Sequence, residues 1–457
     1  MSSTAHGADD AGTPADGFSR RTLLGLAGGG LAAAGLAAAS GFGAGRATAP
    51  AATPTASQRL YPFTGVHQAG ITTPAQDRMY LAAFDLTTTR RDDVISLLRT
   101  WTTMAARLTQ GLGAGPDGFA AGQYDAPPDD TGEAADLPVA GLTITVGFGR
   151  SLFVGADGAT DRFGLADRLP AALVAMPHFS GDALDPAICD GDLLVQACTD
   201  DPQVAVHAIR NLSRAAFGTA RIRWTQLGYG RTSSTSTAQT TPRNLFGFKD
   251  GTANLMAEET SALEDFVWVQ PEDSAADSTA GTDSSWMVGG SYLAGRRIRM
   301  TIETWDRTSL REQETVFGRE KAHGAPLSGG QEHSAPDFDL AGRGGTPIID
   351  PASHVRLAHP SSHGGTRMLR RGYNFTDGND ALGRLDAGLY FVAFVRDPRT
   401  GFIPVQTALA SKDLLSEYLL HTGSALAAVP PGVPDGALRS DGSLRDPLVH
   451  LGSTLFA

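Results

Sequence analysis

Three polar residues in the second half of the sequence stand out by their type and their neighbours. Asp250 lies between glycines in Gly-Phe-Lys-Asp-Gly, His354 lies in Ser-His-Val-Arg-Leu, and Arg370 opens the arginine pair of Leu-Arg-Arg-Gly-Tyr. A carboxylate can accept and return a proton, a neutral imidazole can ligate a metal, and a guanidinium stays charged at any working pH. Together these are the three groups that peroxide chemistry at a haem iron would require.

Each of these residues also has an ordinary alternative. An aspartate between glycines suits a plain turn, and an arginine pair suits a solvated surface. The histidine could instead belong to a zinc site with His359 and His363. That spacing fits no regular zinc motif, and a proline and a glycine interrupt the segment, so zinc is the weaker interpretation.

The helices and strands expected from the sequence follow a similar order in the two halves of the chain. In the first half, alternating or continuous apolar runs predict strands, and an apolar periodicity of 3.6 predicts helices. We expect strands at 79–86, 142–148, 192–199 and 221–227, and helices at 92–110 and 202–217. In the second half we expect strands at 266–269, 292–305 and 389–395, and helices at 309–317 and 412–421.

This order predicts a duplicated α+β fold. Each half would be ferredoxin-like (βαββαβ), with an antiparallel sheet and helices on one face. The chain would divide near residues 230–242, into an N-terminal domain at 61–240 and a C-terminal domain at 241–457. The Gly/Pro-rich segment 318–365 is too long for an ordinary connection, which indicates a functional loop around His354.

Length and composition limit the function classes. The chain has 457 residues, 41% hydrophobic and 19% charged, which is typical of a soluble globular protein of two domains. A net charge of -12 argues against nucleic-acid binding. Two cysteines, Cys189 and Cys198, exclude a disulfide framework and cysteine-rich metal sites. One bridge between them and two free thiols both remain open.

The N-terminus carries an export signature. Ser-Arg-Arg-Thr-Leu-Leu at 19–24 is a twin-arginine pattern, followed by a mild Ala/Gly/Leu stretch and a small-residue cleavage site at 47–49. We therefore expect a signal peptide at 1–49, a disordered lead-in at 50–60, and an extracellular, cell-envelope or periplasmic protein. A membrane anchor is the alternative. No other segment is apolar enough to span a bilayer, so the mature form is expected not to insert into a membrane.

The three segments resemble the haem motifs of the dye-decolorizing peroxidases, and the likeness runs through most of the mature chain. It extends to Phe-Gly-Arg at 317–319 and Gly-Ala-Pro-Leu at 324–327. The resemblance implies one haem b in the C-terminal half, with His354 as the proximal iron ligand, Asp250 as the distal acid/base and Arg370 as the distal cation. It also suggests that Lys249, Gly251, Arg319 and Arg356 contact the haem, Arg319 and Lys249 through its propionates.

Two further groups of residues would complete such a site. A carboxylate bonded to the second nitrogen of His354 would raise its donor strength, and Asp413 and Glu417 are the candidates. A buried haem cannot touch a bulky dye, so electrons would leave through oxidisable side chains. Tyr390, Tyr373 and Trp305 are the candidates for a radical site.

The resemblance leaves more than one function open. The first is a secreted peroxidase that reduces hydrogen peroxide and oxidises dyes or phenolic reductants. The second is a haem-handling protein that, like the deferrochelatase-type relatives, releases iron. The third is a secreted sugar- or metal-binding protein without haem. Because aspartic acids titrate near pH 3.9, the first interpretation predicts dye oxidation that is best at acidic pH. The oligomeric state stays open.

Overall fold

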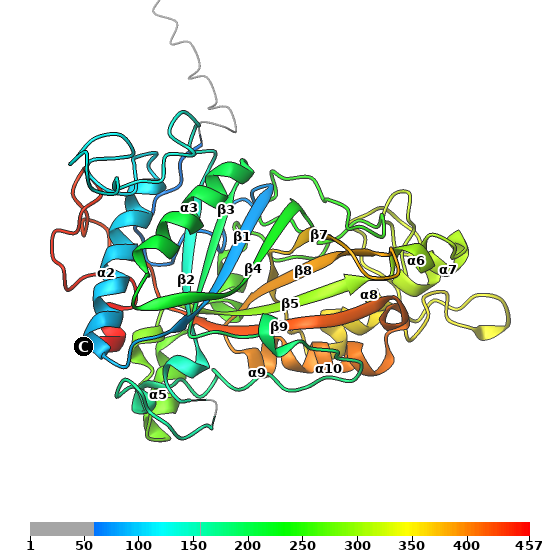
Figure 1. The fold of residues 1–457 in the computed structure, drawn as a ribbon. Helices are drawn as coiled ribbons and strands as arrows, with labels where there is room; N and C mark the ends of the chain where they lie inside the picture. The colour runs from blue at the N-terminus through cyan, green and yellow to red at the C-terminus, as the bar shows by residue number, and fades with distance from the viewer. Residues whose placement is uncertain (1–58, 156) are drawn as a thin grey trace, which may run out of the picture. The chain divides into compact units, whose positions relative to one another are not determined.

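The first half of the molecule is a four-stranded antiparallel sheet with two long helices. The computed structural model describes residues 59–155 and 157–457, and the predicted export signal lies outside them (Figure 1). The strands pair in the order β4-β1-β3-β2. All the elements predicted for this half are present. They are β1 (Arg78–Leu86), α2 (Arg91–Leu108), β2 (Thr143–Gly149), β3 (Leu193–Thr199), α3 (Pro202–Ala215) and β4 (Ala220–Arg231).

The second half repeats this strand order with shorter helices. Its main strands pair in the order β9-β5-β8-β7, and the two-residue β6 pairs with β8 on the same side as β7. The strands are β5 (Ser291–Met300), β6 (Leu369–Arg370), β7 (Tyr373–Asn379), β8 (Leu385–Val395) and β9 (Leu419–Val429). The helices include α4 (Thr260–Phe266), α5 (Pro271–Thr279), α6 (Ile302–Trp305), α7 (Leu310–Phe317), α8 (His354–Ala358), α9 (Pro398–Gly401) and α10 (Ile403–Lys412).

The two sheets join at both ends. Phe148 of β2 pairs with Ala428 of β9, and Tyr229 of β4 pairs with Asn374 of β7. Because β5 also pairs with β8, the described strands close into a ring. The predicted α+β class with two ferredoxin-like antiparallel halves is confirmed. The domain boundary near residue 240 stays a prediction.

Three predicted elements of the second half are wrong. The apolar run at 266–269 is not a strand, because α4 ends at Phe266 and the chain then turns. The strand predicted at 292–305 ends at Met300 and is followed by α6. The helix predicted at 412–421 does not form, because Asp413 is extended and its side chain caps a short 3₁₀ turn that leads into β9.

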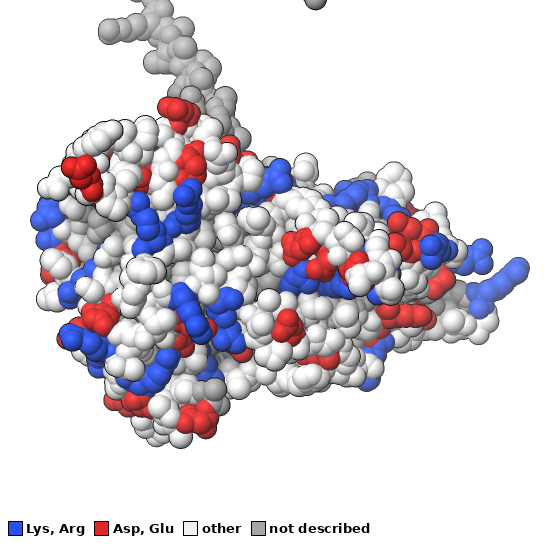
Figure 2. Space-filling model, in the orientation of Figure 1, with Lys and Arg blue, Asp and Glu red and all other residues white. Residues whose placement is uncertain are grey.

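The two cysteines are separate, buried free thiols, so the alternative of a bridge is wrong. Burial raises the pKa of both the Cys189 and Cys198 thiols, which keeps them neutral. None of the helices in the described part of the chain has the length and apolar character needed to cross a bilayer. Acidic and basic side chains are interspersed over the face shown in Figure 2.

Candidate active site

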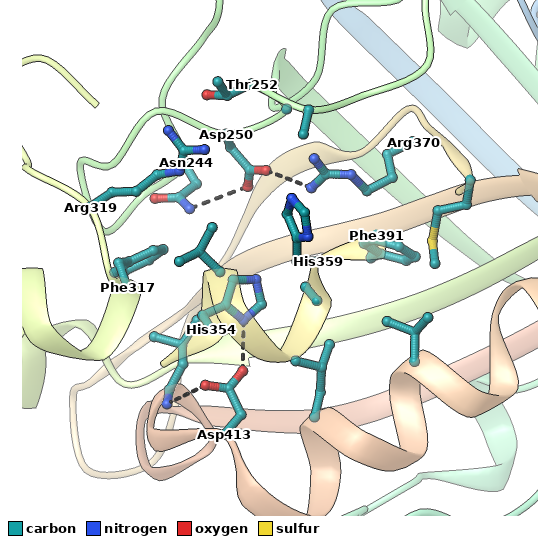
Figure 3. A pocket seen from close by; sticks show the side chains of 18 of the residues that line it. Asn244, Asp250, Thr252, Phe317, Arg319, His354, His359, Arg370, Phe391 and Asp413 are labelled. Atoms are coloured by element: carbon teal, nitrogen blue, oxygen red, sulfur yellow. Dashed lines mark hydrogen bonds and ion pairs between the residues drawn. The ribbon is translucent and has the colours of Figure 1, made fainter. Parts of the chain in front are cut away.

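A pocket lies in the second half, between the sheet and its covering helices and loops. Its floor is the outer face of β5, β8 and β9, and α8 and α10 form one wall. The loop that carries Asp250 and the segment around Arg370 form the opposite wall (Figure 3). All the residues that line it come from positions 244–421, as predicted for a site in the C-terminal half.

His354 and Asp413 form a pair on one side of the pocket. His354 is the first residue of α8, and its Nδ1 lies 2.6 Å from Oδ2 of Asp413. Asp413 is buried between α10 and the 3₁₀ turn, where its other oxygen accepts the backbone N–H of Leu415 at 2.9 Å. Burial opposes protonation of the imidazole, but the charge and hydrogen bond of Asp413 outweigh it and raise the pKa of His354. The Nδ1–H therefore donates to Asp413, and Nε2 is left to face the pocket (Figure 3).

Asp250 lies across the pocket from His354, with both carboxylate oxygens engaged (Figure 3). Oδ1 accepts Nη1–H of Arg370 at 3.0 Å, and Oδ2 accepts an amide hydrogen of Asn244 at 3.3 Å. Asn244 is itself buried, and its Oδ1 accepts the backbone N–H of Phe246. These hydrogen bonds hold the Asp250 carboxylate and the Arg370 guanidinium next to each other at the wall of the pocket.

A second asparagine holds Arg370 in place. Asn254 accepts the backbone N–H of Arg370 at 2.7 Å and donates to its carbonyl oxygen at 2.8 Å. The same amide donates to the carbonyl of Ser234 at 2.8 Å, which ties the acid-bearing loop to a third segment. Sequence reasoning missed the roles of Asn244 and Asn254, because nothing in their spacing separates them from other buried asparagines.

Gly251 allows the loop that carries Asp250 to pass close to a neighbouring segment of the chain. Its φ is +86°, and a Cβ there would lie 2.9 Å from the Cα of Ser233. A side chain at position 251 would therefore push the loop away from residues 232–236, and Asp250 with it. Gly251 also lines the pocket, and its contact with a haem stays a prediction.

Of the other residues predicted to contact the haem, two line the pocket and one does not. Arg319 and Lys249 line the pocket; Arg319 donates to the carbonyls of Gly324 and Glu332, and Lys249 pairs with the Glu332 carboxylate. Arg356 does not line the pocket, because its guanidinium turns to the carbonyl of Phe338 at 2.8 Å.

Of the two predicted partners for His354, the structure selects one. Asp413 makes the contact, whereas Glu417 is exposed and does not line the pocket. The 3₁₀ turn that replaces the predicted helix is the reason, because it turns Glu417 outward while Asp413 caps its start.

None of the three candidate radical residues lines this pocket. Trp305 lies behind a lining residue: its ring centroid is 5.7 Å from that of Phe317, which lines the pocket and lies 6.0 Å from the His354 ring. Tyr390 belongs to β8, a strand that lines the pocket, but its own side chain does not. Leu389 and Phe391 take that face, and Tyr390 points to the other side of the sheet, where the buried Tyr373 also lies.

The comparisons with known proteins agree with this geometry. Residues 68–230 match the family model "Dyp-type peroxidase, N-terminal", and residues 241–434 match "Dyp-type peroxidase, C-terminal". The chain belongs to the Dyp-type peroxidase family. The family assignment confirms the predicted class of enzyme, a haem peroxidase.

Curated and solved members of the family are similar over most of the chain. Deferrochelatase from Escherichia coli K12 is 38% identical over 387 residues, which are 84% of this chain and 86% of the relative. DtpA from Streptomyces lividans is 38% identical, with a TM-score of 0.76 over 89% of this chain and 100% of DtpA. A DyP-type peroxidase from Streptomyces coelicolor gives 38% identity and a TM-score of 0.75 over 88% and 99% of the two chains.

The residues present suit the cofactor of this family. The imidazole of His354 offers a free nitrogen to an iron, and its partner Asp413 is of the kind that raises ligand strength. The walls on which a flat macrocycle would pack are apolar, with Ile298, Met300, Phe317, Leu389, Phe391, Val405 and Leu409. The guanidinium of Arg319, which donates to neutral carbonyls, suits one of its carboxylates, whereas Lys249 already pairs with Glu332.

Proposed function

We propose that this Dyp-type peroxidase reduces hydrogen peroxide in the pocket between His354 and Asp250 and oxidises phenolic or dye-like reductants. The placement of two polar pairs on opposite walls of the pocket carries the proposal. His354 and Asp413 stand on one wall, and Asp250 and Arg370 stand on the other. Haem, when bound, supplies the iron at which the peroxide O–O bond is cleaved and which stores the oxidising equivalents.

The residues of the chain divide the remaining work. Ionised Asp250 accepts the proton of the arriving peroxide and returns it to the departing oxygen, which leaves as water. Arg370, 3.0 Å from Asp250, offsets the negative charge that develops on that oxygen. Asn244 and Asn254 hold Asp250 and Arg370 in place, and the hydrogen bond to Asp413 leaves Nε2 of His354 facing the pocket, where it would hold the iron of a bound haem.

The reaction with peroxide tests these roles. Haem-loaded wild type and Asp250→Asn are mixed with stoichiometric peroxide and followed by rapid absorption spectroscopy. The variant should keep its haem and react about 10² to 10⁴ times more slowly, because general acid–base catalysis is lost. Asp441→Asn changes an acid outside the pocket and should match wild type. If Asp250→Asn reacts as fast as wild type, Asp250 does not move the proton.

A haem-handling role is the second candidate, because the name of a relative with 38% identity favours it. That relative is called deferrochelatase, and the same pocket would bind haem in either case. Added haem would then lose its iron while the porphyrin stays intact. Recovery of metal-free protoporphyrin by chromatography would support this role, and recovery of intact haem only would exclude it.

We also propose that the protein is exported by the twin-arginine machinery to the cell envelope, periplasm or exterior. The twin-arginine pattern at 19–24 and the cleavage motif at 47–49 support this. The pathway carries folded proteins, which suits a cofactor inserted before export. Replacing both arginines by lysine should retain the protein in the cytoplasm, as immunoblots of cell fractions would show. Export of the double variant at the wild-type level would contradict the proposal.

A further inference from the structure

Arg371, the second residue of the arginine pair, lies outside the active-site pocket. It directly follows Arg370, and the two side chains point in opposite directions, as those of consecutive residues in an extended chain do. Arg370 lines the pocket, whereas Arg371 is fully buried and does not line it. An arginine is almost never fully buried unless it has partners, so the partners of Arg371 indicate its role.

The partners of Arg371 are uncharged and come from segments that are distant along the chain. Its guanidinium donates to the carbonyls of Ile71 and Thr73, to the side-chain oxygen of Gln76 and to the hydroxyl of Thr235. A guanidinium holds its N–H donors in a fixed planar fork, so it can bind several acceptors at once with defined geometry. Arg371 therefore joins residues 71–76 to the segment around Thr235.

The segment at 232–236 also holds the backbone of Arg370. The carbonyl of Ser234 accepts the amide of Asn254 at 2.8 Å. Asn254 in turn accepts the backbone N–H of Arg370 at 2.7 Å and donates to its carbonyl at 2.8 Å. The backbone of Arg370 is thus held from one side through Asn254 and from the other by the buried side chain of Arg371.

The side chain of Arg370 has little support of its own. Within the described residues its guanidinium makes one hydrogen bond, to Asp250 at 3.0 Å, and the side chain is 26% exposed. The place of this guanidinium therefore depends on where the backbone at position 370 is held. A displacement of about 1 Å at a catalytic group can cost about 10²-fold in rate, so this support matters for the reaction.

We propose that Arg371 is a positioning residue for Arg370, and that residues 71–76 set the place of the Arg370 guanidinium through it. The proposal rests on the peroxidase function above. Arg371 fastens the backbone at 370–371 to the first half of the chain. This keeps the Arg370 guanidinium beside Asp250, on the wall of the pocket opposite His354.

Arg371→Met tests the proposal, because it removes the guanidinium and keeps a long side chain. The variant should bind haem as wild type does and react with stoichiometric peroxide about 10 to 100 times more slowly. Fluoride binding is a readout without turnover. Fluoride binds at ferric haem and accepts a hydrogen bond from a nearby cation, so its affinity, measured by absorption titration, should fall about tenfold when Arg370 is displaced.

The same substitution in an Arg370→Leu background separates positioning from a general loss of stability. If Arg371 acts through Arg370, its replacement should change the peroxide rate and the fluoride affinity of Arg370→Leu by less than about twofold, because the two effects are not additive. A residue that only stabilises the fold would have the same effect in both backgrounds. That result would overturn the proposal.

Gln76→Leu tests the contribution of residues 71–76 and decides the question if Arg371→Met does not fold. It removes one acceptor of Arg371 and should slow the peroxide reaction and weaken fluoride binding about threefold, a smaller displacement than in Arg371→Met. Gln68→Leu is the matched control, because Gln68 is also buried but donates to the carbonyls of Val146 and Pro430.

Wild-type values of both quantities in Gln76→Leu would overturn the proposal, and so would an equal loss in Gln68→Leu. An Arg370→Leu variant that reacts with peroxide at the wild-type rate would instead refute the role of Arg370 in the proposed function. The fluoride titrations would then still show whether Arg371 positions Arg370, so the two failures can be told apart.

Discussion

The two halves of the ring share a strand order but differ in what covers their sheets. In the first half, α2 and α3 are long amphipathic helices that pack on the sheet, and residues such as Trp101, Leu98 and Ile209 are buried in the core between them. In the second half, the short α8 and α10 stand off from the sheet and leave the active-site pocket. The helices that cover the sheet, and not the order of its strands, therefore create the active-site pocket.

Each half also has a histidine–aspartate pair, and the surroundings of the two pairs differ in the same way. His207 Nε2 lies 2.8 Å from Asp130, whose oxygens also accept the backbone N–H groups of Ala114 and Gly132. That pair joins α3 to the loop at 111–138 and does not line the active-site pocket. The His354 pair leaves one imidazole nitrogen facing an open space. The same two side chains hold a loop in one half and present a ligand in the other.

The strongest test of the difference between the two histidine–aspartate pairs is to replace each histidine in turn. His354→Ala should abolish the Soret band and the reaction with peroxide, because it removes the imidazole that Asp413 holds toward the pocket. His207→Ala should bind haem as wild type does, while losing about 1–3 kcal/mol of unfolding free energy, since Asp130 keeps its charge without its partner. Haem titration and chemical denaturation measure the two effects. Loss of haem from His207→Ala alone would contradict the division of roles.

Asp413→Asn should have the next largest effect. The amide keeps the shape of the side chain but not its charge, so the imidazole becomes a weaker ligand. We expect haem affinity or peroxidase activity to fall about 10- to 100-fold. Glu417→Gln is the matched control because Glu417 is exposed. Equal effects of the two substitutions would contradict the assignment of Asp413 as the partner of His354.

Asn244→Leu should slow the reaction with peroxide while leaving haem binding unchanged. Asn244 donates to Oδ2 of Asp250 at 3.3 Å, so its loss leaves that carboxylate less firmly oriented. We expect the rate of the peroxide reaction to fall roughly tenfold, because a displaced catalytic group loses part of its orientation. Asn374→Leu removes a buried amide outside the pocket and should leave the rate unchanged. A wild-type rate in Asn244→Leu would mean that Asn244 does not act through Asp250.

Asp130→Asn should leave the peroxidase activity unchanged but lower the free energy of unfolding. Burial opposes ionisation of Asp130, but the backbone N–H groups and His207 outweigh it, so its pKa lies below the ordinary 3.8. The carboxylate therefore adds stability above pH 3.8, and this contribution is lost as the pH falls through the lowered pKa. The variant should unfold more easily than wild type at pH 7, by about 1–3 kcal/mol, and the difference should shrink below pH 3.8. A constant difference in urea titrations at both pH values would contradict this.

The sequence was most informative where periodicity or a motif was strong. Alternating apolar residues located β1 to β4, and the spacing of apolar residues located α2 and α3, because these elements pack one clear face against the core. The motifs located Asp250, His354 and Arg370, which the structure brings to one pocket. Periodicity failed at 412–421, where a capping carboxylate ends the helix that the leucine spacing suggests.

Side-chain direction was beyond the reach of the sequence. Tyr390 stands in an almost continuous apolar run, and in such a strand the composition does not show which residues take which face. Arg356 lies two residues after the iron-ligand candidate, yet a carbonyl at Phe338, distant along the chain, draws it away. Asn244 and Asn254 depend on contacts with Asp250 and Arg370 that only the folded loops create.

Because the strands close into a ring, the C-terminal half of this enzyme cannot be separated from the N-terminal half without exposing strand edges. The half that holds the pocket meets the other half at β9 and at β7, where Ala428 and Asn374 pair with Phe148 and Tyr229. A chain that began at residue 241 would leave the backbone groups of both strands without their partners. Unpaired strand edges recruit other chains. The first half thus protects the catalytic half from self-association, although it supplies no residue to the pocket.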